Sequence, residues 1–240
     1  MYLGIITTMS VTGSKIVAVC GPIGAGKTTL VKSLEQSFDR LNTEIINGND
    51  AEAKRFGTYS VKTYDEAVHP ALLNLFLCDQ RKYAFAFQLF MLTRRQLNYE
   101  LARTDHVDIS IIDRSLTDDL VFASLQHKLG NISDDEFAAY KEIYDSFKPN
   151  KPDIVLWLKV PVDIAMQRIA KRNRDNECNY TREYISLLHK TYDEVMTEQF
   201  PPDCGVKVIP LVWDKDVPIV DNVLTNSTCD DLIGEIIGKK

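Results

Sequence analysis

The sequence predicts an α/β protein whose five-stranded parallel β-sheet carries helices on both faces. Three observations predict it. Short apolar runs rich in β-branched residues recur along the 240 residues, and segments with helical spacing of apolar residues separate them. The first of these runs leads directly into a glycine-rich loop. The length suits one large domain, so residues 1–14 are expected to be an N-terminal extension and residues 15–240 a single domain.

The strands are identified by their apolar character and by the glycine or proline residues that follow or precede them. The first reads KIVAVC and ends at Gly21, and the second is placed at TEIIN because of its central isoleucine pair. The five predicted strands are residues 15–20, 43–47, 107–112, 154–159 and 206–212.

The helices are identified by apolar residues that recur at intervals of three and four. Acidic residues in the first turn of the segment that begins at Asp134 suit the positive end of a helix dipole. Residues 50–70 are polar and are expected to be irregular, with breaks at Gly57 and Pro70. The six predicted helices are residues 28–41, 80–103, 116–127, 134–147, 162–172 and 181–199.

Composition excludes several classes of protein. The formal net charge of −6 argues against general binding of nucleic acid, which requires clustered positive charge. The sequence contains no run of eighteen apolar residues, so no transmembrane helix is expected. The N-terminus lacks the features of a secretory or transit peptide. The five cysteines have no zinc-site or redox spacing, so a reduced, cytoplasmic setting is expected.

A phosphate-binding loop follows the first strand. The segment GPIGAGKT matches G-x-x-x-x-G-K-[ST], and it lies between a strand and a helix, as this motif requires. Its backbone N–H groups and the helix N-terminus favour phosphate, the lysine reaches the β- and γ-oxygens, and the threonine is a Mg²⁺ ligand. The residues predicted to bind ATP here are Gly21, Gly24, Ala25, Gly26, Lys27, Thr28 and Thr29.

An Asp-Arg pair follows the third predicted strand. Ligands of parallel sheets bind at the carboxyl ends of the strands. Asp113 is therefore a candidate Mg²⁺ ligand, and Arg114 a candidate phosphate ligand. The alternative is a carboxylate at the start of a helix beside a solvated arginine.

Three arginines in RIAKRNRDNE form a second basic cluster. Arg168 and Arg172 are four residues apart and share one helix face, and Arg174 follows. They suit an arginine-rich lid over a transferring phosphoryl group, with Arg172 and Arg174 in catalytic roles. A solvated basic face is the alternative.

Together the segments GPIGAGKTT, YAFAFQLF, DRSLTDDLVFA, RIAKRNRDNE and EYISLLHKTYDEV resemble the deoxynucleoside kinase family. They are in the family's order and extend over residues 16–195. The resemblance implies a P-loop kinase fold, ATP and Mg²⁺ as cofactors, a deoxynucleoside substrate and a homodimer.

The resemblance also implies roles for particular residues. Gln88 matches the glutamine that reads the base, and Glu177 matches the acid that reaches the sugar 3′-hydroxyl. Asp113 and Arg114 stand where the family has its magnesium acid and the arginine after it. Phe56 and Phe87 are candidates to hold the base.

In three places the sequence departs from the family pattern. The family's catalytic carboxylate after the second strand, commonly in a Glu-Pro pair, has no clear counterpart here. Asp50 is ranked first as the general base, with Glu52 next and Glu44 if the strand has another register. Leu77 replaces a tyrosine that assists at the sugar in animal members.

The third departure concerns the base pocket. In the family, members that accept deoxycytidine and purine deoxynucleosides have an arginine seven residues after the glutamine, paired with an aspartate. Arg95 has this spacing, but both Asp118 and Asp119 compete for the aspartate position because the segment is one residue short. A surface salt bridge is the alternative for this pair.

The expected function is transfer of the γ-phosphate of ATP to the 5′-hydroxyl of a deoxynucleoside for DNA precursor salvage, with dC, dA and dG preferred over dT. A nucleoside monophosphate kinase of the thymidylate type is one rival. A P-loop scaffold without turnover is another.

Overall fold

A computed structural model describes residues 14–47, 58–65, 68–147, 151–172, 180–212, 219–220, 223–224 and 226–238. In these residues no helix is both long enough and apolar enough to cross a membrane.

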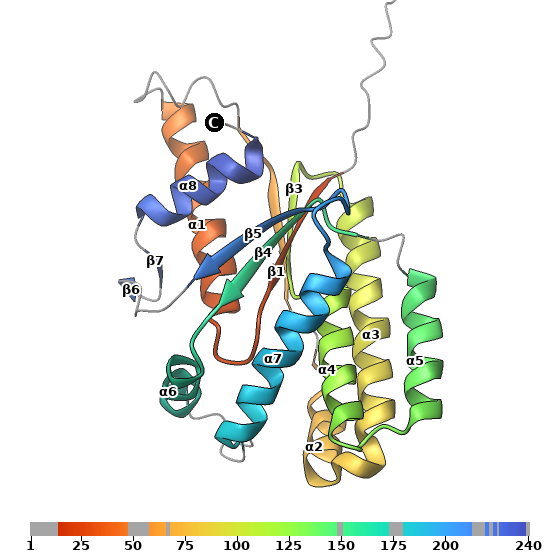
Figure 1. Cartoon of the computed structure of the whole chain (residues 1–240). Coiled ribbons are helices and arrows are strands. Elements are labelled where there is room, and N and C mark those ends of the chain that lie inside the picture. Colours follow the sequence, from red (N-terminus) through yellow and green to blue (C-terminus); the bar gives the residue numbers. More distant parts are fainter. Residues whose placement is uncertain are drawn as a thin grey trace, which may run out of the picture.

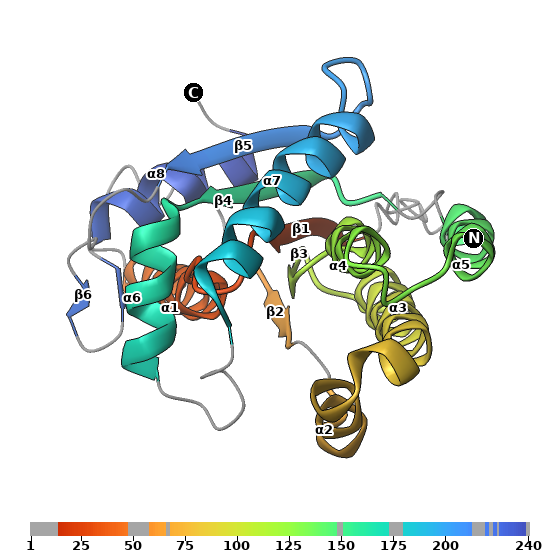
Figure 2. The ribbon, with the colours of Figure 1, turned by 60° about the horizontal axis from the view of Figure 1, so that its bottom comes forward.

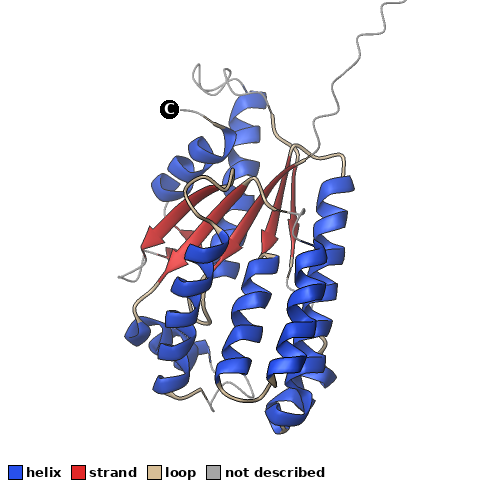
Figure 3. Cartoon of the chain, turned by 45° about the vertical axis from the view of Figure 1, so that its right-hand side comes forward, coloured by secondary structure: helices blue, strands red, loops and turns tan. Residues whose placement is uncertain are grey.

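A five-stranded parallel sheet forms the centre of the fold, as predicted. Its strands run in the order β2-β3-β1-β4-β5, and every neighbouring pair is parallel. The arrowheads in Figure 3 accordingly point the same way. The bounds are β1 Lys15–Cys20, β2 Val61–Tyr64, β3 Ile109–Asp113, β4 Ile154–Lys159 and β5 Lys207–Val212.

Helices cover both faces of the sheet. Figures 1 and 2 show α3, α4 and α5 grouped on one side of the strands and α1 and α8 on the other. The helices are α1 Lys27–Asn47, α2 Pro70–Cys78, α3 Gln80–Thr104, α4 Leu116–Lys128, α5 Asp134–Phe147, α6 Val162–Arg172, α7 Arg182–Gln199 and α8 Asn226–Ile237.

Alternation along β1 explains why the sheet has two cores. Val17 and Val19 pack in the cluster that contains α1 and α8. Ile16, Ala18 and Cys20 point to the opposite face and pack with residues of α3, α4 and α7. Both faces of this central strand are thus apolar, as a buried parallel strand requires.

The prediction of a strand at residues 43–47 is wrong, because these residues continue α1. The Arg40–Glu44 pair, 3.8 Å apart and one turn apart in sequence, supports the extension, and Thr43 Oγ1 donates to the Asp39 carbonyl at 2.8 Å. Ile46 is 74% exposed, so this isoleucine does not pack in the core of the sheet. The second strand is instead Val61–Tyr64, within the segment expected to be irregular.

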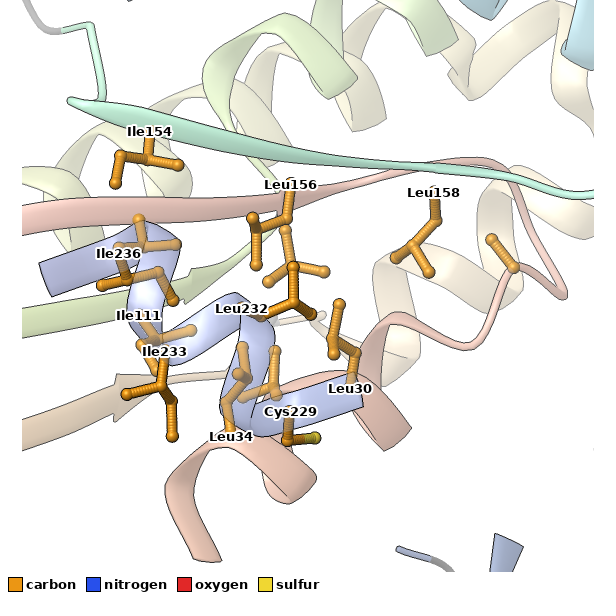
Figure 4. Packing of buried hydrophobic residues seen from close by; sticks show 14 of the residues in the cluster. Leu30, Leu34, Ile111, Ile154, Leu156, Leu158, Cys229, Leu232, Ile233 and Ile236 are labelled. Atoms are coloured by element: carbon orange, nitrogen blue, oxygen red, sulfur yellow. The ribbon is translucent and has the colours of Figure 1, made fainter. Parts of the chain in front are cut away.

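Sequence patterns also missed α2, α8 and the antiparallel pair β6 Ile219–Val220 and β7 Val223–Leu224. Helix α8 closes one core: Leu232, Ile233 and Ile236 pack below Leu156 of β4 and beside α1 (Figure 4). Lys15 Nζ donates to the Ile236 carbonyl at 2.9 Å, and Lys207 Nζ to the Glu235 carbonyl at 3.0 Å. Two cations from the sheet therefore satisfy carbonyls in the last turn of α8.

Leu232→Ala should destabilise the protein by ~2–5 kcal/mol, because it removes a side chain buried between α8, α1 and the sheet. Denaturant unfolding followed by circular dichroism measures the change. Asp231→Ala, at an exposed neighbouring position of α8, is the matched control. Equal stability of the two variants would show that α8 is not an integral part of this core.

Candidate active site

The candidate site lies where the strand order changes direction. From β1 the chain passes to β2 and β3 on one side, and then to β4 and β5 on the other. The phosphate-binding loop follows β1, and Asp113 ends its neighbour β3. Such a crevice at the carboxyl ends of parallel strands is the general ligand site of open α/β sheets.

The loop at Gly21–Thr28 has the conformation of a phosphate cradle. Gly24 has a φ of +79°, and a Cβ at this position would lie 2.7 Å from the Ala165 carbonyl oxygen, so only glycine fits. Lys27 is buried at the start of α1, and its Nζ donates to the carbonyls of Gly21 and Pro22 at 2.8 and 2.9 Å. The helix N-terminus and this ammonium group place positive charge at the loop.

Thr28, in the first turn of α1, contacts Asp113 at the end of β3. Thr28 Oγ1 donates to Asp113 Oδ2 at 3.0 Å. The other oxygen, Asp113 Oδ1, is buried and has no hydrogen-bond donor in the described part of the chain. A hydroxyl and a carboxylate oxygen are ligands that Mg²⁺ accepts, so these two residues fit a magnesium site.

Arg114 adopts a left-handed conformation with a φ of +73°, which is rare for a residue with a Cβ. Such strain is common at functional sites, where the surrounding structure holds the residue in place. The Arg114 Nη1 donates to the Gly21 carbonyl at 3.2 Å and to the Tyr192 hydroxyl at 2.8 Å. Its guanidinium also lies over the Phe122 ring, 4.9 Å from the ring centroid. The guanidinium therefore lies directly beside the start of the phosphate loop.

Gln88 and Arg95 lie on the same face of α3, two turns apart, and both are buried. Arg95 Nε donates to Asp119 Oδ2 at 2.6 Å, and Arg95 Nη1 donates to the Asp113 carbonyl at 3.0 Å. The side chains of Arg95 and Asp119 are only 5% and 3% exposed, so this pair is not a surface salt bridge.

The structure decides between the two aspartates that the sequence left open. Asp119 is the partner of Arg95. Asp118 points elsewhere: its Oδ2 accepts from the N–H and the hydroxyl of Ser115 at 2.8 and 3.0 Å, which completes a capping box at the start of α4. Its Oδ1 faces Tyr192 and the phosphate loop.

An apolar cluster includes residues of α2 and residues that flank Gln88 on α3. The Phe87 ring stacks on the Phe76 ring of α2, with centroids 4.7 Å apart and planes at 9°. Met91 and Leu77 belong to the same cluster. A second predicted base contact, Phe56, lies outside the described residues.

The structure describes two of the three predicted lid arginines. Arg168 Nη1 donates to the Ala25 carbonyl at 3.4 Å, so α6 reaches the phosphate loop. Arg172 is the last residue of α6 and is exposed. Arg174 and Glu177 lie outside the described residues, as do Asp50 and Glu52. Glu44 lies on α1, paired with Arg40, and not at a strand end.

Two features of the site were missed from sequence. The second strand along the chain is β2, and the acids that follow it are Asp65 and, next in sequence, Glu66, which lies outside the described residues. The alternating run VKTY, rich in β-branched residues, could have revealed this strand. The contact of Tyr192 with Arg114 had no sequence signal, since 78 residues separate them.

Comparisons with known proteins agree with this geometry. The family model described as deoxynucleoside kinase matches residues 17–232. A deoxyguanosine kinase of Dictyostelium discoideum is 32% identical over 237 residues, covering 94% of this chain and 74% of the relative. A deoxyadenosine kinase of the same organism is 28% identical over 198 residues, covering 81% and 71%. A solved structure of deoxyadenosine kinase from M. mycoides, with dCMP and a flexible dCDP bound, has a TM-score of 0.65 and 26% identity, covering 93% of this chain and 98% of that one.

Proposed function

Because this chain belongs to the deoxynucleoside kinase family, we propose that it transfers the γ-phosphate of ATP to the 5′-hydroxyl of deoxycytidine, deoxyadenosine or deoxyguanosine in preference to thymidine. The function as a deoxynucleoside kinase follows from the family.

The observation that carries the proposal is the meeting of two motifs at neighbouring strand ends. Thr28 from the phosphate loop and Asp113 from the Asp-Arg pair are in hydrogen-bond contact, although 85 residues separate them. The buried Arg95–Asp119 pair lies next to them, because Arg95 also donates to the Asp113 carbonyl. The phosphate loop and the buried Arg95–Asp119 pair therefore belong to one site, with Asp113 between them.

In the proposed mechanism, protein groups position the reactants and stabilise the charge of the transferring phosphoryl group. Lys27 and the loop amides bind the β- and γ-phosphates. Arg114, beside the loop, contributes positive charge where phosphate oxygens would lie. Mg²⁺, held by Thr28 and Asp113, would neutralise phosphate charge when bound.

The general base is proposed to be Asp65 or Glu66. The resemblance places this carboxylate just after the second strand, and β2 ends at Tyr64. This location replaces the argument for Asp50, which relied on a strand at residues 43–47 that is part of α1. The carboxylate would orient the 5′-hydroxyl and accept its proton.

Base preference is proposed to depend on the Arg95–Asp119 pair. The carboxylate of Asp119 and the carbonyl of Asp113 hold the buried guanidinium in a fixed orientation, and a guanidinium carries only N–H donors. Acceptors on cytosine and on purine edges suit such donors, whereas the methyl group of thymine would need the same space. Gln88, two turns away on the same helix face, adds an amide that both donates and accepts.

The double variant Arg95→Met/Asp119→Ala is expected to shift preference towards thymidine. Both partners are replaced because removing one alone would leave a buried charge without its ion-pair partner. The kcat/KM values for the four deoxynucleosides measure the shift, about 10-fold or more in the ratio of thymidine to deoxycytidine. Arg94→Met, at the exposed neighbouring position, is the control. If thymidine ranks first for the unmodified protein, the proposed base preference is wrong.

The lid and the assembly are proposed on family grounds. Arg168 contacts the phosphate loop, and Arg172 and Arg174 are proposed to bind the phosphates of ATP. Glu177 is proposed to bind the sugar 3′-hydroxyl, and residues 15–240 are proposed to be one kinase domain that forms a homodimer. Light scattering during size-exclusion chromatography tests the dimer.

A coupled assay of ATP consumption tests the function. The unmodified protein is assayed with each deoxynucleoside, with each deoxynucleoside monophosphate and with no acceptor. Turnover that depends on a deoxynucleoside supports the proposal. Turnover only with monophosphates would make the protein a monophosphate kinase, and none with any acceptor would make it an inactive scaffold.

A further inference from the structure

A buried hydroxyl lies between the two charged groups beside the phosphate loop. The Tyr192 hydroxyl donates to Asp118 Oδ1 at 2.8 Å and accepts from Arg114 Nη1 at 2.8 Å. The arginine and the carboxylate themselves are 3.6 Å apart. All three side chains are buried. Arg114 precedes α4 and Asp118 lies in its first turn, whereas Tyr192 belongs to α7, much later in the chain. The tyrosine hydroxyl therefore bridges Arg114 and Asp118, whose charged atoms are too far apart for a direct hydrogen bond.

This bridge is connected to the first residue of the phosphate loop. The Gly21 N–H donates to Asp118 Oδ1 at 3.3 Å, and the Gly21 carbonyl accepts from Arg114 Nη1 at 3.2 Å and from Lys27 Nζ at 2.8 Å. Gly21 has a φ of +154°, and a Cβ there would lie 2.9 Å from the Leu158 carbonyl oxygen. The loop, Arg114 and Lys27 are thus fixed by one set of hydrogen bonds.

The hydroxyl keeps its proton in this environment. Burial, and then the Asp118 carboxylate, raise the pKa of Tyr192 well above its ordinary value. A neutral hydroxyl between the two groups satisfies both, and it prevents their direct contact. Without it, the attraction between unlike charges in a buried site would draw Arg114 towards Asp118.

We propose that Tyr192 is a positioning residue for phosphoryl transfer, whose hydroxyl holds the Arg114 guanidinium in place beside the phosphate loop by keeping it apart from Asp118. The inference rests on the proposed function, because it assigns Arg114 to the transferring phosphate. Tyr192 itself touches no reactant in this scheme.

The ring of Tyr192 can be kept while its hydroxyl is removed. The ring packs edge-to-face against Phe122, with centroids 6.2 Å apart, and Phe122 also lies under the Arg114 guanidinium. Tyr192→Phe retains this packing. The variant therefore tests the bridge and not the filling of the core.

The test compares Tyr192→Phe with Tyr99→Phe, a second buried tyrosine, whose hydroxyl donates to the Lys151 carbonyl away from the loop. Tyr192→Phe should lower kcat on the order of 10- to 100-fold, with the KM values for ATP and deoxynucleoside little changed, because misplacement of about 1 Å has such effects. Tyr99→Phe should leave kcat unchanged. Melting temperature is recorded for both variants.

A second substitution tests the cause of the loss. Asp118→Asn keeps the shape of the side chain but removes the charge that would draw Arg114 away. In the double variant Tyr192→Phe/Asp118→Asn, the loss in kcat should be smaller than the product of the two single losses.

The outcomes separate the inference from the proposed function. If the unmodified protein phosphorylates deoxynucleosides but Tyr192→Phe keeps kcat within about 3-fold, whatever its melting temperature, the inference is wrong and the function stands. Independent losses in the double variant, or an equal loss in Tyr99→Phe, would also overturn it. An unmodified protein that does not use deoxynucleosides would overturn the proposed function and the inference with it.

Discussion

Lys27→Ala is expected to lower kcat by about 10³-fold or more while the protein remains folded. Lys27 is the single ammonium group of the phosphate loop, and its Nζ lies against the carbonyls of Gly21 and Pro22 at the start of the cradle. A charge that binds the transferring phosphoryl group is most strongly engaged in the transition state, so its loss affects kcat directly.

The measurement is steady-state kinetics with the preferred deoxynucleoside, beside circular dichroism to confirm folding. Lys32→Ala is the matched control, because Lys32 is an exposed lysine on the same helix, and it should retain full activity. A folded Lys27→Ala protein with near-normal kcat would contradict the assignment of this loop to phosphate.

The second large effect is expected at the carboxyl end of β2. Either Asp65→Asn or Glu66→Gln should lower kcat by roughly 10²- to 10⁴-fold with a much smaller change in KM, since a general base acts in the transition state. The residue with the larger loss is the base. Asp50→Asn, Glu52→Gln and Glu44→Gln should each be mild.

Steady-state kinetics on the five variants tests this assignment. The amide substitutions preserve side-chain shape, so a loss of activity reports the missing carboxylate. A large loss in Asp50→Asn, with both residues after β2 tolerant of substitution, would return the role to Asp50 and contradict the location of the base after β2.

Local sequence determined most of the fold. The strands at residues 15–20 and 154–159 and the helices at residues 134–147 and 162–172 have the predicted bounds. Apolar periodicity and glycine punctuation are local signals, and in these segments the tertiary contacts agree with them. The phosphate loop was likewise predictable from the sequence, because its motif specifies the backbone geometry of eight consecutive residues.

Tertiary structure decided the position of the second strand. Residues 43–47 have β-branched side chains, but local contacts such as Arg40–Glu44 favour the continuation of α1. Four residues of VKTY become a strand because Val61 to Tyr64 pair in register with Ile109 to Ile112 of β3. An edge strand this short depends on its partner for its hydrogen bonds, and so its own sequence is a weak signal.

Tertiary structure also decided the pairings within the site. The sequence supplied Arg95 and two adjacent aspartates, and only the orientation of α4 against α3 makes Asp119 the partner of Arg95 and directs Asp118 to the phosphate loop. Residues one apart on a helix point about 100° apart, so the two cannot exchange roles. Tyr192 contacts Asp118 from 74 residues further along the chain. The sequence by itself determined the phosphate loop and the Asp-Arg pair, because each is a motif of consecutive residues. The packing of α3, α4 and α7 on the sheet determined which side chains meet, because contacts between distant segments leave no periodic pattern in the sequence.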